Sequence, residues 1–204
     1  MFCRRICFIG LFISVFGFVV SAQSKLSSEI KKWVVSENST LRVNGNTNIN
    51  KFSCDILAYD QTDTLIVDQN KSNSGVALTG EVNLSIRSFD CHNSMMTRDL
   101  RKTLKEKEFP LMRIKFLSLN KLPDLTQKPE PITGWVYIEL AGAAKRFEVN
   151  YHIFEDAEKV IHLTGDRDIN FTDFNLMPPM KLGGMIKTND KLSVDFYLKI
   201  KVAE

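Results

Sequence analysis

Hydrophobic and polar residues alternate with a period of two along much of this chain. The clearest alternation covers residues 76–87. That period is typical of a β-strand with one face in the core and the other in solvent. The links between strands are short and turn-like, which favours antiparallel pairing, and about seven or eight such strands predict a sandwich or a barrel. Further runs of this kind lie at 41–56, 112–116, 135–140, 146–153, 161–164 and 192–201.

One segment has a helical period instead. In FDCHNSMMTRDLRKTLKEKEFP, Phe89–Pro110, the residues Met96, Leu100 and Leu104 recur every four positions. This spacing places them on one face of an amphipathic helix. Ser94 is the expected N-cap, and Pro110 ends the helix because a residue before proline avoids the α region. On a barrel, such a helix is expected to cover one end as a lid.

The amino-terminal segment differs in composition from the rest. Two arginines precede an apolar run, Ile6–Val20, and small residues up to Ala22 offer a cleavage site. This layout predicts a secretory signal peptide over residues 1–22 and a single domain over 23–204. The apolar run is short for a membrane span, so an uncleaved signal anchor is the alternative. We expect a periplasmic or secreted chain without a membrane span after cleavage.

Charge and cysteine content narrow the picture further. Once the leader is removed, basic and acidic side chains nearly balance, and no basic run is interleaved with aromatics. The chain therefore offers no nucleic-acid surface. Cys54 and Cys91 are the two cysteines outside the leader, in a compartment that permits disulfides. A bridge between them is one expectation, and two buried free thiols are the alternative.

The histidines give a weak signal for chemistry. His152 and His162 would face each other if the pairing around the Glu155–Glu158 hairpin made their numbers sum to 314. Zinc sites need three or four ligands, so solvated surface histidines are the expected reading and no metal is predicted. His92 has no nucleophile placed beside it.

The charged residues near the end of one predicted strand are also weak candidates for catalysis. Asp166 and Asp168 share one face of that strand and are expected on the outer surface. Arg167 falls on the apolar face. It is expected either to meet a carboxylate or a ligand head group inside, or to extend to the barrel rim.

Four short segments, in order, resemble the YceI-like lipid- or polyisoprenoid-binding proteins. His92 and Asn175 stand where that family usually has glycine, and both positions are expected to need a positive φ. The segments are Thr47–Phe52 (TNINKF), Phe89–Arg101 (FDCHNSMMTRDLR), Phe109–Phe116 (FPLMRIKF) and Thr172–Leu176 (TDFNL).

The resemblance implies an all-β, lipocalin-like antiparallel barrel of about eight strands with one amphipathic helix. It implies an exported carrier that holds an apolar lipid, of polyisoprenoid or isoprenoid quinone type, in the lumen. Each buried CH₂ contributes about 0.8 kcal/mol, so such binding needs no catalytic residue, and neither an enzyme nor a cofactor is expected. The alternative is a secreted β-domain with a packed core that acts as a structural or stress-response interaction module. The oligomeric state stays open between a monomer and a homodimer.

The strand phases predict which residues line the lumen. Phenylalanine and methionine are frequent enough to suit an adaptable cavity, although most apolar faces simply pack. The helix would contribute Met96, Leu100 and Leu104. The strands would contribute Leu78, Val82, Leu84, Ile86, Ile114, Phe116, Val149, Tyr151, Ile161, Leu163, Val194, Phe196 and Leu198.

Overall fold

The computed structural model describes residues 30–57, 59, 61–69, 75–125 and 130–203. The expected signal peptide over residues 1–22 lies outside this part. The described strands form a closed antiparallel barrel of eight strands, so the fold class expected from the alternating pattern is confirmed. The strands are β1 (Ile30–Val35), β4 (Thr64–Asp68), β5 (Val76–Ser85), β6 (Leu111–Leu119), β7 (Ile132–Leu140), β8 (Ala143–Glu155), β9 (Ile161–Asn170) and β12 (Lys191–Ala203).

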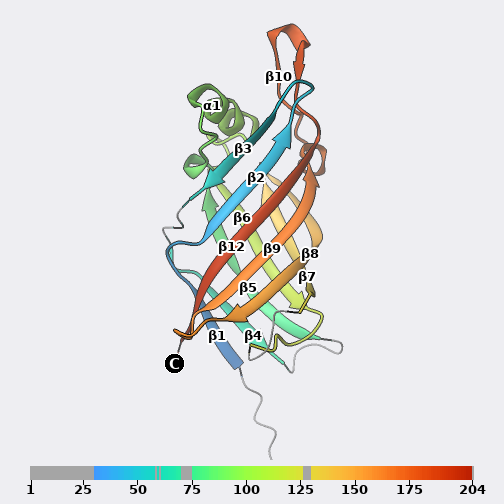
Figure 1. The fold of residues 1–204 in the computed structure, drawn as a ribbon. Helices are drawn as coiled ribbons and strands as arrows, with labels where there is room; N and C mark the ends of the chain where they lie inside the picture. The colour runs from blue at the N-terminus through green and yellow to red at the C-terminus, as the bar shows by residue number, and fades with distance from the viewer. Residues whose placement is uncertain (1–29, 58, 60, 70–74, 126–129, 204) are drawn as a thin grey trace, which may run out of the picture.

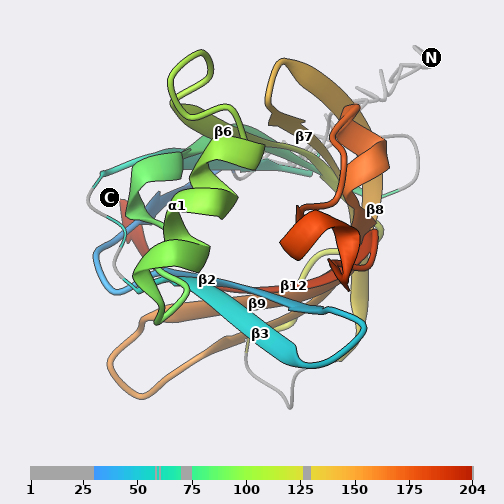
Figure 2. The same ribbon diagram turned by 90° about the horizontal axis from the view of Figure 1, so that it is seen from above.

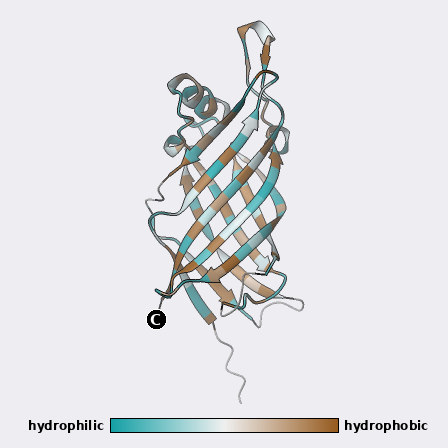
Figure 3. Cartoon of the chain, viewed as in Figure 1, coloured by the Kyte–Doolittle hydropathy of each residue, from teal (hydrophilic) through white to brown (hydrophobic). Residues whose placement is uncertain are grey.

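The barrel closes between its first and last strands. Each strand in the order β1, β4, β5, β6, β7, β8, β9, β12 pairs with the next, and β12 pairs again with β1 (Figure 1). Closure removes the exposed edges that an open sheet would present. Hydrophobic and hydrophilic residues alternate along the strands, as Figure 3 shows, which matches the period of two in the sequence.

Two further strands, β2 (Thr40–Asn46) and β3 (Lys51–Ile56), lengthen the wall at one end of the barrel. The last residues of β12 pair with β1, whereas Ser193–Tyr197 pair with β2. β3 then pairs with β2 and is the last strand of the sheet. The predicted run 41–56 is therefore a hairpin of two strands rather than one strand.

A disulfide ties this last strand to the chain that precedes the helix. Cys54 of β3 is bonded to Cys91, with the two Cα atoms 3.9 Å apart. Next to it, Asp55 and Asp90 exchange two backbone hydrogen bonds, of 2.7 and 2.9 Å. Of the two alternatives for the cysteines, the structure contains the bridge.

The predicted helix is α1 (Ser94–Thr103), at the same end of the barrel as the β2–β3 turn. The expected N-cap Ser94 is wrong by one residue. Asn93 caps the helix, and its side-chain oxygen accepts hydrogen bonds from the backbone N–H groups of Met95 and Met96. No helix in the described part of the chain is long and apolar enough to cross a bilayer.

The helix presents its apolar stripe to the core, as predicted. Leu100 and Leu104 are buried, and Met96 is partly buried against the same core. Viewed along the barrel axis, α1 lies over one side of the ring, and the segment from residue 171 to 187 lies over the other (Figure 2). That segment contains η2 (Phe171–Phe174), β10 (Met180–Lys181), η3 (Leu182–Gly184) and β11 (Ile186–Lys187).

The register of the β8–β9 hairpin differs from the one considered for a histidine pair. His152 pairs with Thr164, and His162 pairs with Phe154. The reason is a longer loop, in which the Asp156 N–H donates to the Val160 carbonyl oxygen at 3.0 Å. The two histidines therefore do not face each other, and the considered register is wrong.

Candidate functional site

A narrow cavity of about 40 Å³ lies inside the barrel. Its walls come from β2, β5, β6, β7, β8, β9 and β12 and are mainly aliphatic and aromatic. We call it the lumen cavity. Its lining consists of Ser39, Thr40, Leu41, Tyr59, Val82, Leu84, Ile114, Phe116, Val136, Ile138, Val149, Arg167, Ile169, Val194, Phe196 and Leu198.

The lumen cavity occupies only the half of the barrel that is nearer to α1. On β8, Val149 lines it, whereas Tyr151 and Ile153, farther from α1, are buried without touching it. On β9, Ile169 lines it, whereas Leu163 does not. The other strands follow the same order. The half towards the β8–β9 hairpin is filled by large side chains that are each at most 2% exposed. They are Trp33, Leu65, Leu78, Tyr151, Ile153, Ile161, Leu163 and Ile200.

The residues predicted to line the lumen therefore divide into groups. Val82, Leu84, Ile114, Phe116, Val149, Val194, Phe196 and Leu198 line the cavity. Leu78, Tyr151, Ile161 and Leu163 have the correct phase but belong to the packed half, and Ile86 and Leu104 are likewise buried core residues outside the cavity. Met96 and Leu100 line a separate groove at the rim. As ligand contacts, all of them remain predictions.

Some lining residues were not predicted. Val136 and Ile138 lie on the apolar phase of an alternating run, and that signal could have placed them in the lumen. Ile169 continues the apolar phase of Ile161 and Leu163 past a glycine and an arginine, which obscured the pattern. Ser39 lies just before β2 and Thr40 is the first residue of that strand, where nothing in the sequence marked an inward position.

Arg167 is the charged residue of the cavity lining. It lies on the inward phase of β9, as the sequence indicated, and its side chain is exposed rather than enclosed. Its guanidinium group lies 5.9 Å from the centre of the Phe147 ring, a cation–π arrangement. Among the described residues no carboxylate lies within ion-pair distance of it, so its N–H donors are available at the edge of the cavity.

Two aromatic rings meet where the cavity gives way to the packed half. Phe196 lines the cavity and packs edge-on against Tyr151, with ring centres 5.9 Å apart. Gly165 makes room for Phe196, because a Cβ there would lie 2.2 Å from the end of its ring. The Tyr151 hydroxyl is buried without a hydrogen-bond partner in the described structure, and burial raises its pKa. That phenol stays neutral and is unsuited to act as a base.

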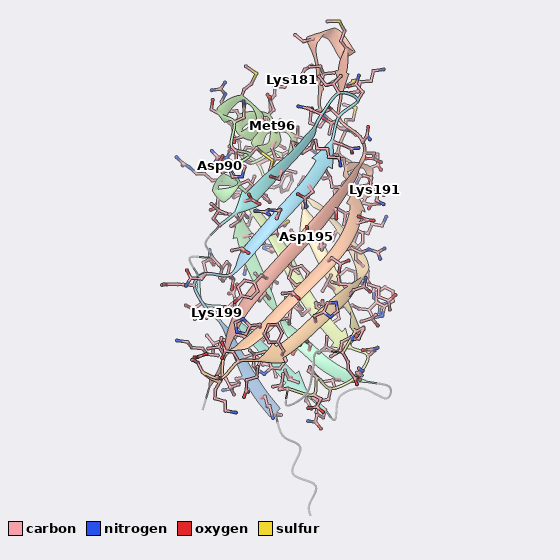
Figure 4. The ribbon with its side chains drawn as sticks, in the orientation of Figure 1. Asp90, Met96, Lys181, Lys191, Asp195 and Lys199 are labelled. Atoms are coloured by element: carbon pink, nitrogen blue, oxygen red, sulfur yellow. A yellow bond between two sulfur atoms is a disulfide. The ribbon has the colours of Figure 1, made fainter. Side chains whose placement is uncertain are left out.

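A second hollow lies at the rim, between the β2–β3 turn, α1 and the β10–β11 hairpin. We call it the rim groove, and its volume is about 210 Å³. Among the residues that the structure describes, none lines both the rim groove and the lumen cavity. Figure 4 shows Met96 and Lys181 at this end of the molecule. The lining of the groove includes Ile49, Phe52, Met95, Met96, Leu100, Pro179, Lys181 and Ile186.

The titratable clusters of the described structure lie on the barrel wall. One of them borders an open surface hollow of about 560 Å³, whose lining includes Arg42, Asp55, His152, Asp166 and Asp195. Asp55 accepts hydrogen bonds from Arg42 Nε at 2.6 Å and from His92 Nε2 at 2.8 Å. Burial works against the charge of Asp55, but these two partners outweigh it and lower the pKa of its carboxyl group. The arrangement suits a structural ion pair, because both oxygens of Asp55 are bonded to neighbouring side chains.

His162 takes part in a second cluster at the other end of the barrel. Its ring lies 2.7 Å from the Tyr197 hydroxyl and 2.7 Å from Asp156 Oδ2. The hydrogen bond with His162 lowers the pKa of Asp156. Asp166 and Asp168 are exposed, as expected. No group of three or more His, Cys, Asp or Glu side chains in the described chain is arranged to hold a metal ion.

Several solved structures have the same fold as this chain. A polyisoprenoid-binding domain from Saccharophagus degradans, implicated in plant cell wall breakdown, superposes with a TM-score of 0.57 at 12% identity, covering 84% of this chain and 98% of that one. BcnA from Burkholderia cenocepacia gives 0.56 at 15% identity, covering 81% and 96%.

A mutant of the YceI protein from Campylobacter jejuni gives a TM-score of 0.51 at 14% identity, covering 70% of this chain and 81% of that chain. No protein-family model matches the sequence, and no curated protein matches it. At such identities the likeness establishes the fold. The chain has the barrel of YceI-like proteins, in agreement with the resemblance drawn from four short segments.

Proposed function

We propose that this protein is an exported, YceI-like carrier that binds the tail of an apolar lipid, of polyisoprenoid or isoprenoid quinone type. The observation that carries the proposal is the lumen cavity, an apolar-walled space in one half of a closed barrel. A solved domain with the same fold is described as polyisoprenoid-binding, which supports the ligand class. Burying a tail there contributes about 0.8 kcal/mol per CH₂.

The proposed orientation follows from the walls. The tail would lie between β5, β6, β8 and β12, and the packed half of the barrel would limit its depth. Arg167 lies at the cavity edge, where no described carboxylate is within ion-pair distance, and it would donate hydrogen bonds to a polar or anionic head group. Binding, rather than catalysis, is the proposed activity, because the paired Asp55 and the neutral Tyr151 offer no activated group beside the cavity.

The size of the cavity favours a second candidate function. A volume of about 40 Å³ has room for about three waters, so a long tail would have to displace side chains. Val194, Phe196 and Ile114 are only partly buried and are the side chains best placed to move. If they stay in place, the barrel is a packed β-domain that acts through its surface as a structural or stress-response interaction module.

Native mass spectrometry of the mature chain, residues 23–204, purified without detergent, separates the two functions. The carrier proposal expects an additional bound mass of several hundred daltons, and organic extraction should release an isoprenoid lipid. An apo mass, with no uptake when polyprenols or quinones are offered, would reject the carrier and leave the interaction module.

Matched variants on β12 locate the ligand. Val194 lines the lumen cavity, whereas Val202 on the same strand is exposed outside it. Val194→Trp should fill the cavity and abolish lipid uptake, and Val202→Trp should leave uptake unchanged. Val194→Ala should keep lipid uptake or increase it, which would show that substitution at this position does not by itself prevent folding. Equal uptake by the two tryptophan variants would place the ligand elsewhere.

A further inference from the structure

The methionines gather at one end of the molecule rather than in the lumen. Of the six in the described part of the chain, Met112 is buried and the other five lie at the rim, on α1 and on the segment around β10 and β11. Six large apolar side chains at the rim are each more than half exposed. We call these six the rim cluster: Ile49 (66% exposed), Met95 (56%), Met177 (84%), Met180 (64%), Leu182 (65%) and Met185 (69%).

The rim cluster projects beyond the barrel. The β10–β11 hairpin extends past the other elements at this end (Figure 1). At its tip, a Cβ added to Gly183 or Gly184 would have no atom within 4 Å. Leu182 lies beside them with a φ of 51°, a left-handed conformation that is unfavourable for leucine and that presents its side chain to solvent. Within the described molecule, nothing covers this apolar tip.

The projecting segments are held in place by polar contacts. The Asn48 N–H donates to the Lys187 carbonyl oxygen at 3.0 Å, and the Lys187 N–H donates to Asn48 Oδ1 at 2.9 Å. The Asn48 amide also donates to the Met185 carbonyl oxygen. Lys181 of β10 forms an ion pair with Asp99 of α1. The β2–β3 turn, the hairpin and the helix therefore present one preformed surface.

Two lysines without an ion-pair partner among the described residues, Lys51 and Lys187, lie beside this apolar surface, whereas Lys181 is paired with Asp99. Residues 47–51 and 177–188, which form the turn and the hairpin, contain Lys51, Lys181 and Lys187 and no acidic residue. Lys51 and Lys187 are exposed. Apolar side chains at a tip with lysines behind them are the arrangement of a peripheral membrane-binding surface, because the former enter the acyl boundary and the latter meet anionic head groups.

We propose that the rim cluster docks the barrel onto an anionic lipid bilayer with the rim facing the membrane. The apolar side chains stand on three linked elements with the rim groove between them. A fluid bilayer can adapt to such an uneven surface, whereas a protein interface needs a closely complementary partner. The biological use of docking, transfer of a lipid between membrane and lumen, rests on the proposed function. The docking itself does not require a lumen ligand.

Vesicle flotation tests the proposal with residues 23–204, which contain every strand of the described barrel. The probe is a vesicle of phosphatidylcholine with about 30% phosphatidylglycerol, compared with phosphatidylcholine alone. We expect flotation with the anionic vesicle, weakened by raising salt from about 50 mM to about 500 mM. No flotation with anionic vesicles at low salt would overturn the proposal.

Variants separate the apolar and electrostatic contributions. Leu182→Ser with Met185→Ser should raise the vesicle Kd about tenfold or more at both salt concentrations. Lys51→Gln with Lys187→Gln should weaken binding at low salt and have little effect at high salt. Leu122→Ser, an exposed apolar residue at the opposite end of the barrel, is the matched control and should bind as the parent does. Equal binding by all variants would overturn the assignment of the surface.

Two controls keep this test independent of the lumen. The cavity-filled Val194→Trp should still float with anionic vesicles, so loss of lipid uptake there would count against the carrier alone. Sedimentation velocity of the parent tests the competing occupant, a second copy of the chain. A concentration-dependent dimer that Leu182→Ser with Met185→Ser abolishes, in a chain that does not float, would reject the bilayer and assign the rim cluster to a dimer.

Discussion

At the scale of single residues, Asp55 shows how a buried charge is stabilised. Its side chain is 3% exposed, while those of Arg42 and His92 are each 57% exposed. Burial disfavours the carboxylate, but the two hydrogen bonds outweigh that effect and lower its pKa. Because the pKa is lower in the folded state, ionised Asp55 stabilises the fold at pH values above the ordinary pKa of a carboxyl group. This stabilisation is lost as the pH falls through the folded-state pKa.

Asp55→Asn should therefore destabilise the protein near neutral pH and flatten its acid sensitivity. Hydrogen bonds to charged groups contribute about 1.5–3 kcal/mol, and the exposure of both partners places the expected loss near the lower end. Guanidinium unfolding from about pH 7 to about pH 3 measures this. The difference between parent and variant should shrink below about pH 5, and a difference that stays constant throughout would contradict the role of this pair.

Residue-level expectations succeeded where backbone geometry dictates the residue. His92 and Asn175, expected to need positive φ, have φ values of 57° and 55°. Arg167 was correctly placed on the inward phase of its strand. The methionines, however, were associated with the lumen. Five of the six that the structure describes lie at the rim instead, because the flexible methionine side chain does not fix which apolar surface it occupies.

At the scale of elements, the disulfide joins two segments that are paired in the described structure only by the isolated bridge between Asp55 and Asp90. Cys54 belongs to the last strand of the sheet, and Cys91 belongs to the turn before α1, 37 residues along. Closing a loop of that length in the unfolded chain stabilises the fold by about 4 kcal/mol in the chain-entropy model. Both cysteines are buried.

Cys54→Ala with Cys91→Ala should consequently lower the free energy of unfolding by about 2–4 kcal/mol, and reductant should add nothing to the loss. Chemical unfolding of parent and variant, each with and without reductant, checks this. A parent that unfolds at the same denaturant concentration in both conditions would mean that the bridge has no stabilising role.

Elements with a long, regular pattern were predictable, and short or turn-dependent ones were not. β5, β8 and β12 follow alternating runs, and the α1 stripe gave the helix. β1 and β4 were missed because they are only six and five residues long and carry little alternation. The β8–β9 register depended on the loop from Asp156 to Val160, whose hydrogen bonding the sequence does not show.

At the scale of the whole molecule, the barrel is packed unevenly along its axis. One half is filled by large, fully buried side chains, and the half beneath α1 keeps the lumen cavity. The sequence could not show this, because both halves follow the same alternating pattern. Space depends on side-chain shapes across the barrel, including the room that Gly165 gives to Phe196.

Alanine substitutions of Leu163 and Leu198 test this difference in packing between the two halves, since the two leucines are direct partners on neighbouring strands. Leu163 is fully buried in the packed half, whereas Leu198 borders the cavity and already lacks neighbours on one side. Leu163→Ala should destabilise the fold by about 3–5 kcal/mol, and Leu198→Ala by about 2 kcal/mol. Chemical unfolding measures both losses.

Leu198→Ala should also take up lipid more readily, because it widens the cavity. Equal destabilisation with unchanged uptake would show that the barrel is as well packed at Leu198 as at Leu163, and would favour the interaction module over the carrier.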